Sequence, residues 1–148
     1  MNLSKNFTLE ELTVSQDAAR RGLDNTPDAE TIENLKRLAI LLEEIRLLLG
    51  HPIIVSSGYR SPKVNSIVGG SPNSAHKYGL AADFTCPGYG SVYEVCMAIR
   101  DSGIVYDQLI LEFGAWVHIG LSDEPRRQNL SIFKGTGYLP GIVERMAA

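Results

Sequence analysis

A histidine and an aspartate stand seven positions apart in the stretch SAHKYGLAADF, residues 74–84, which begins polar, is broken by a glycine and ends apolar. The carboxylate of Asp83 follows apolar residues of an expected strand, where it would be costly without a cation. Gly79 permits a turn that returns His76 toward it. Imidazole and carboxylate are zinc ligands, and a catalytic zinc takes three protein ligands. Spacing alone leaves open the alternative of a loop histidine and a turn aspartate.

A third metal-binding side chain, His118, lies in the alternating segment WVHIGL. Val117 and Ile119 would point to the core and His118 to the other face. The preceding segment YDQLILEF also alternates, so the two predict a hairpin. If residues 113–115 form a three-residue connection, Glu112 and His118 share a face diagonally, with backbones roughly 7–8 Å apart. A two-residue turn would break this parity.

The stretch SAHKYGLAAD resembles the Ser-x-His-x-x-Gly-x-Ala-x-Asp signature of the zinc murein peptidases, which include D-Ala-D-Ala carboxypeptidases and phage L-alanyl-D-glutamate endopeptidases. SSGYRSPKVN resembles the segment upstream of that signature, and WVHIG resembles the strand that carries the third ligand. The resemblance extends from about Phe7 to Leu121. It implies the hedgehog/D,D-peptidase fold and one zinc ion bound by His76, Asp83 and His118.

The resemblance also implies roles for residues around the metal. Arg60 would hold a substrate carboxylate or polarise the scissile carbonyl, to which a planar guanidinium is suited; without the motif, a surface arginine is an equal alternative. Ser74 would hydrogen-bond the substrate. Many family members carry the general-base carboxylate three residues before the last histidine, where this chain has Ala115. We favour Glu112, at an offset that resembles the zinc-binding domain of hedgehog proteins, with Asp107 as second candidate.

The spacing of apolar residues predicts helices followed by strands, hence an α+β fold with helices packed on a small, mainly antiparallel sheet. FTLEEL predicts a capped N-terminal helix that ends near Arg21. A second helix is expected to begin with Thr26 as N-cap and to end before Gly50. A long loop is predicted over 60–74 and a helix over 91–101. Strands are predicted in PIIVSS, LAADFTC, YDQLILEF and WVHIGL.

Length and composition predict one domain over residues 1–148, with a core of about 7–121 and a weakly patterned C-terminal extension over 122–148. The net charge of −3 argues against general affinity for nucleic acid. No stretch approaches the roughly 18 apolar residues of a membrane span, and no signal-peptide pattern is recognised. Cys86 and Cys96 are expected to be buried and unpaired, with a bridge between them as the alternative.

These observations predict a monomeric zinc metallopeptidase that hydrolyses an amide bond in peptidoglycan stem peptides, as a D,D-carboxypeptidase or an L-alanyl-D-glutamate endopeptidase. Synthesis in the cytoplasm, action on the cell wall, and a phage or prophage origin of the endolysin kind are further expectations. Two alternatives remain open. One is a catalytically inactive zinc-binding module or virion component of the same fold, and the other is a structural domain without metal.

Overall fold

The computed structural model describes residues 1–144 of the chain. In chain order the elements are α1 (Gln16–Arg21), α2 (Ala29–Leu49), β1 (Ile54–Ser57), α3 (Pro62–Ile67), the 3-10 helix η1 (Ala75–Tyr78), β2 (Ala81–Thr85), α4 (Val92–Arg100), β3 (Gln108–Glu112), β4 (Trp116–Gly120), β5 (Gln128–Ile132) and β6 (Leu139–Pro140).

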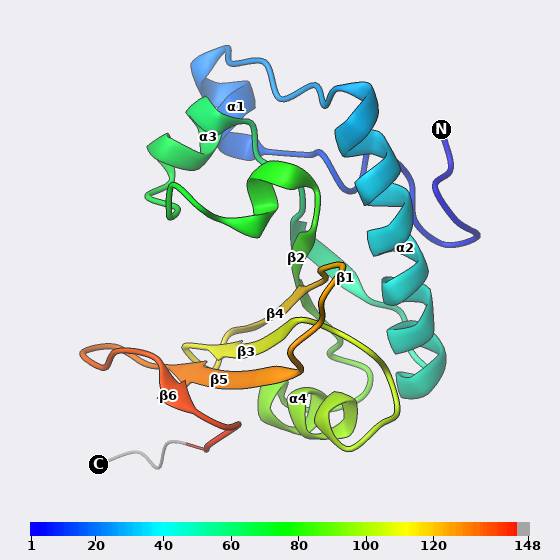
Figure 1. Ribbon diagram of the computed structural model, residues 1–148, viewed down its shortest axis with the longest axis vertical. Helices are drawn as coiled ribbons and strands as arrows, with labels where there is room; N and C mark the ends of the chain where they lie inside the picture. The colour runs from blue at the N-terminus through cyan, green and yellow to red at the C-terminus, as the bar shows by residue number, and fades with distance from the viewer. Residues whose placement is uncertain (145–148) are drawn as a thin grey trace.

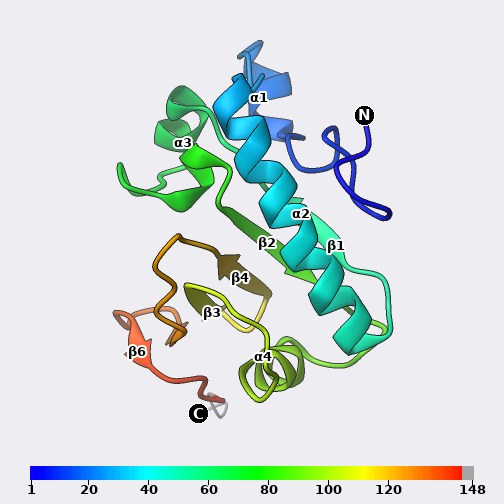
Figure 2. The same cartoon turned by 45° about the vertical axis from the view of Figure 1, so that its right-hand side comes forward.

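The strands form one sheet in the order β1-β2-β4-β3-β5-β6 (Figure 1). All neighbouring pairs are antiparallel except β3 and β5, which run parallel. The hydrophobic core lies between one face of this sheet and helices α2 and α4 (Figure 2). The predicted α+β class with a mainly antiparallel sheet is therefore confirmed.

Helix α2 contributes more buried residues to the core than any other helix. Its N-cap is Asp28, whose carboxylate accepts a hydrogen bond from the Thr31 N–H at 2.8 Å. The prediction of Thr26 as N-cap is wrong because this carboxylate, two residues later, satisfies the first turn instead. Gly50 ends the helix in the left-handed conformation, with φ 68°, as predicted. Its buried residues lie on one side of the helix, at the three- and four-residue spacing typical of a core helix: Leu35, Leu38, Ala39, Leu41, Leu42, Ile45 and Leu49.

The N-terminal segment differs from its prediction. Thr8 and Glu11 make both contacts of a capping box, at 3.0 and 3.4 Å, but they close a turn and no helix. The Leu12 carbonyl accepts from the N–H of Tyr59 at 2.8 Å, so the chain is tied to the residues after β1. Helix α1 begins only after Ser15, which caps it. The local signal was real, but this long-range hydrogen bond decides where the helix begins.

The predicted loop over 60–74 contains a short helix. Ser61 accepts from the N–H of Val64, and Pro62 occupies the first turn, where its missing N–H costs nothing. Helix α4 agrees with its prediction, because Ser91 and Glu94 form a complete capping box.

Both cysteines are buried and unpaired, as expected. Burial raises the pKa of Cys96 to about 12, which keeps the thiol protonated.

The segment after β4 is more regular than its weak pattern suggested. Strand β5 pairs with β3, β6 pairs with β5, and Ile142 is buried in the core. The last four residues of the expected 122–148 extension lie outside the described part of the chain. No helix within residues 1–144 is long and apolar enough to cross a membrane.

Candidate metal centre

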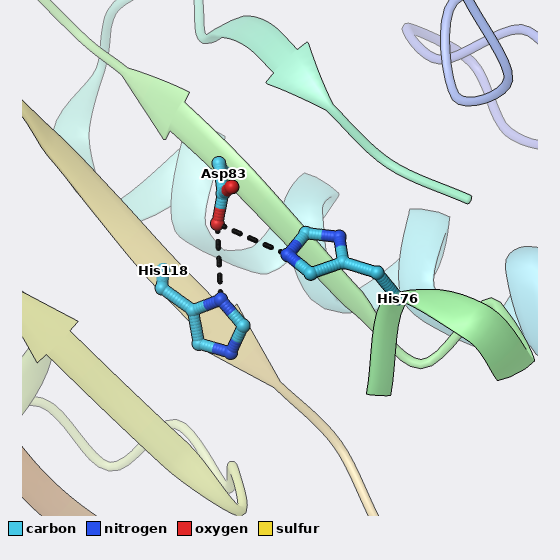
Figure 3. A group of neighbouring side chains, drawn as sticks. All are labelled: His76, Asp83 and His118. Carbon is cyan, nitrogen blue, oxygen red and sulfur yellow. Dashed lines mark hydrogen bonds and ion pairs between the residues drawn. The ribbon is translucent and has the colours of Figure 1, made fainter. Parts of the chain in front are cut away.

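Three side chains from separate elements meet on the sheet face opposite the core (Figure 3). Asp83 of β2 and His118 of β4 are direct partners in the antiparallel ladder, so their side chains are neighbours on one face. His76 comes from η1, which ends at Gly79 in the left-handed conformation, with φ 72°. This is the turn that the sequence predicted. One ligand atom from each of the three side chains lies within 4.8 Å of the others.

The carboxylate of Asp83 lies between the two imidazoles. Its Oδ1 is 3.0 Å from Nδ1 of His118 and 3.3 Å from Nε2 of His76. The histidines are only 2% and 9% exposed. Burial alone would raise the pKa of Asp83, but hydrogen bonds from His118 and then His76 outweigh it and hold this pKa well below its usual range. Asp83 is therefore anionic at any physiological pH, as a metal-binding carboxylate must be.

A backbone carbonyl fixes the orientation of the His76 ring by contacting the nitrogen that does not face Asp83. Its Nδ1 lies 2.7 Å from the carbonyl oxygen of Gly58. Because a carbonyl only accepts, Nδ1 carries the hydrogen of this contact, and Nε2 is the ring nitrogen that faces Asp83. Such a partner on the second ring nitrogen is typical of metal-ligating histidines. Two imidazole nitrogens and one carboxylate oxygen are also a donor set that zinc prefers, so the residues fit a zinc ion.

Glu112 occupies the position that the hairpin parity predicted. It pairs with Trp116 across the three-residue turn 113–115 and shares the face of His118. The indole Nε1 of Trp116 donates to Glu112 Oε2 at 2.7 Å. Burial, followed by the negative charge of Asp83, raises the pKa of Glu112. The centre thus has a basic carboxylate beside its donor atoms.

Arg60 follows β1 in the chain, and its backbone N–H donates to the carbonyl of His76 at 3.0 Å. It lines a cavity of about 500 Å³ together with Asp83, the segment 14–17 and Val55 to Ser57 of β1. Its Nη2 is 3.5 Å from Ser74 Oγ, and its buried Nε has no hydrogen-bond partner among the described residues. Burial lowers the pKa of Arg60, against the charges of Asp83 and Glu112. A buried guanidinium N–H with no partner is suited to an anionic ligand.

Comparison with known protein families gives a match to Peptidase M15 over residues 5–120. The chain belongs to the M15 peptidases. This is the family of zinc murein peptidases, so the resemblance drawn from the sequence is confirmed. The match includes all three candidate ligands, Glu112 and Arg60, whereas β5 and β6 lie beyond it. A comparison with curated proteins gives no match.

The second general-base candidate is not at the centre of this M15 peptidase. Asp107 precedes β3, at the other end of the hairpin from Glu112, and accepts two hydrogen bonds at 2.9 Å from the guanidinium of Arg126. Arg126 holds the pKa of Asp107 below its usual range. Ala115 is exposed at the tip of the turn. We call the sheet face that carries Asp83 and His118 the metal face. Of Asp107, Glu112 and Ala115, only Glu112 presents a carboxylate on it.

Sequence reasoning missed two supporting groups of the M15 centre. Trp116 could have been found, because the alternation that places His118 on the metal face places Trp116 there too. The Gly58 carbonyl gave no signal, because a backbone oxygen is placed by the path of the chain and not by a residue type. That path is tight: a Cβ on Gly58 would lie 2.3 Å from the carbonyl oxygen of Leu12.

Proposed function

We propose that this M15 peptidase uses one zinc ion, held by His76, Asp83 and His118, to hydrolyse an amide bond in the stem peptides of bacterial cell walls. The observation that carries the proposal is the convergence of three zinc-type donor atoms beside the carboxylate of Glu112. When bound, zinc supplies Lewis-acid polarisation of a carbonyl and makes water a nucleophile near neutral pH.

Glu112 is the general base in this proposal. Trp116 holds Oε2, which leaves Oε1 to take the proton from the attacking water and later to pass it to the leaving amine. Burial, the larger cause of the raised pKa of Glu112, makes this carboxylate a better base than an ordinary glutamate.

Arg60 selects the substrate by charge. Arg60 and Asp83 line the same cavity, so an anionic group beside the scissile bond could bind to the guanidinium there. A terminal D-alanine ends in a carboxylate. Glutamate also offers one, because it has two carboxyl groups and only one continues the chain. Arg60 and Ser74 therefore suit both the D,D-carboxypeptidase and the L-alanyl-D-glutamate endopeptidase reaction.

The test is cleavage by the zinc-loaded protein of two peptides, one ending in D-alanyl-D-alanine and one with an internal L-alanyl-D-glutamyl bond. We expect cleavage of one of them, its loss with chelator, and a decrease in kcat of at least about 100-fold in Glu112→Gln. Glu124→Gln, in the exposed segment after β4, is the matched control and should keep full activity. If the zinc-loaded wild type cleaves neither peptide, the proposal is wrong.

A second function rests on one observation: Ala115 stands where many family members have their catalytic carboxylate. On this alternative the chain is a zinc-binding module or virion component without turnover. The cleavage assay on protein that metal analysis shows to hold stoichiometric zinc separates the possibilities, because absence of cleavage favours the module and cleavage favours the enzyme. The setting that we propose for the enzyme is wall degradation of the phage or prophage endolysin kind.

A further inference from the structure

The sheet continues past the metal centre on the side away from Arg60. Glu112 of β3 is the register partner of Ile132 in β5, so these two side chains share the metal face. Ser131 of β5 pairs with Leu139 of β6, and the same antiparallel register continued by one residue puts Tyr138 beside Ile132. Glu112, Ile132 and Tyr138 thus form a row across neighbouring strands on the metal face.

The hairpin loop that carries Tyr138 is well defined. Thr136 closes it, because its N–H donates to the Phe133 carbonyl at 3.0 Å and its hydroxyl accepts from the Phe133 N–H at 3.0 Å. After β6, the N–H of Gly141 donates to the carbonyl of Asn129 at 2.7 Å. The position of Tyr138 is therefore set by hydrogen bonds on both sides of it.

The phenol of Tyr138 is both accessible and close to the centre. The residue is 60% exposed. The register places Tyr138 in the row of Glu112. Burial of the ring's remaining part raises the pKa of Tyr138, and the charges of Glu112 and Asp83 raise it further. The phenol therefore keeps its proton at neutral pH and is available as a hydrogen-bond donor.

The strand order places the candidate ligands between the cavity of Arg60 and Tyr138. Val55 to Ser57 of β1 line that cavity with Arg60, Asp83 and His118 lie on β2 and β4, and Tyr138 precedes β6 at the far edge. A peptide that crosses the sheet with its scissile bond at the ligands would extend toward Arg60 in one direction and toward Tyr138 in the other.

We propose that Tyr138 is a substrate-contacting residue, added by the C-terminal hairpin beyond the matched family region, whose phenol donates a hydrogen bond to the peptide on the side of the ligands opposite Arg60. The inference rests on the proposed function for its substrate.

The test compares Tyr138→Phe with Tyr93→Phe, a matched control on α4, which packs on the opposite face of the sheet. The substrates are the D-alanyl-D-alanine and L-alanyl-D-glutamyl peptides. We expect Tyr138→Phe to lower kcat/KM about tenfold, the size of one lost hydrogen bond, with unchanged Tm and unchanged zinc affinity. Tyr93→Phe should match the wild type. A loss of zinc affinity in Tyr138→Phe would overturn the proposal, because the phenol would then act on the metal.

A second readout does not depend on turnover. In zinc-loaded Glu112→Gln, peptide binding is followed by the fluorescence of Trp116, the only tryptophan of the chain. Adding Tyr138→Phe should raise the peptide Kd about fivefold or more. If the wild type binds without cleaving and Tyr138→Phe weakens binding, the proposed function fails and this contact stands. If proteins with and without Tyr138→Phe have equal cleavage rates and equal peptide Kd values, or if no peptide binds at all, the proposed contact between Tyr138 and the peptide is wrong.

Discussion

The carboxylate of Glu112 is buried close to a second carboxylate, that of Asp83, and both effects raise its pKa. Between the ordinary glutamate pKa of about 4.3 and this raised value, the folded protein binds more protons than the unfolded chain. Stability therefore falls as pH rises through this window, and the cost is fully present once the pH is above the raised pKa. An amide of the same shape removes the charge and keeps an oxygen that can accept from Trp116.

We predict that Glu112→Gln stabilises the metal-free protein by about 0.5–1 kcal/mol at neutral pH, with little effect near pH 4, where both states are largely protonated. Urea unfolding in chelator at the two pH values measures this. Glu124→Gln should change neither value. A Glu112→Gln protein that is less stable than the wild type at neutral pH would contradict the assignment of a raised pKa.

The positions of the individual site residues could be predicted from the alternation of the strands and from the motif. His118 was placed on the metal face by the alternation of its strand, Glu112 by the turn length, and Asp83 was singled out by the motif; the structure has all three on one face. The Tyr138 phenol was not predicted, because its approach depends on a parallel pairing between β3 and β5. Nothing in the local pattern of either strand specifies such a pairing.

Among the elements, the junction after β1 joins the N-terminal segment to η1. Gly58 accepts from His76 Nδ1, Tyr59 donates its N–H to the Leu12 carbonyl at 2.8 Å, and the Arg60 N–H donates to the His76 carbonyl at 3.0 Å. Three consecutive residues thus connect the ligand-bearing η1 to a segment more than 60 residues earlier in the chain. The start of the N-terminal helix was harder to predict from sequence for the same reason, since the hydrogen bond from Tyr59 to Leu12 is long-range and leaves no local signal.

We predict that Gly58→Ala destabilises the protein by about 2 kcal/mol, because a Cβ there would lie 2.3 Å from the backbone oxygen of Leu12. Zinc affinity should fall by about 10–100-fold, as the partner of His76 is displaced. Urea unfolding in chelator and zinc competition with a chromophoric chelator measure the two effects. Gly103→Ala is the control, since a Cβ at Gly103 meets nothing within 4 Å. Equal stability and equal zinc affinity of the two variants would contradict the close approach of Gly58 to the Leu12 carbonyl.

The molecule as a whole extends beyond the region that the family match covers. Strand β5 covers the edge of β3 that would otherwise be open, and Ile142 enters the core. Arg127, just before β5, lies over the ring of the fully buried Tyr106, with its guanidinium carbon 4.6 Å from the ring centre. It also donates to the carbonyl oxygens of Ile104 at 3.1 Å and Ser102 at 2.9 Å, after α4. These contacts indicate that the C-terminal strands belong to the same folding unit as the metal centre.

We therefore predict that Arg127→Ala lowers the free energy of unfolding by about 1–2 kcal/mol through the lost cation–π contact and hydrogen bonds. Alanine would keep the left-handed backbone of this position, at φ 48°, so the change reports the side-chain contacts. Arg21→Ala, at the exposed end of α1, should stay within about 0.5 kcal/mol of the wild type. In urea, Trp116 fluorescence on β4 and far-UV circular dichroism should give coincident single transitions for wild type and variant. An early separate transition in Arg127→Ala would instead make the C-terminal strands an independently unfolding part, which could not hold Tyr138 at the metal centre.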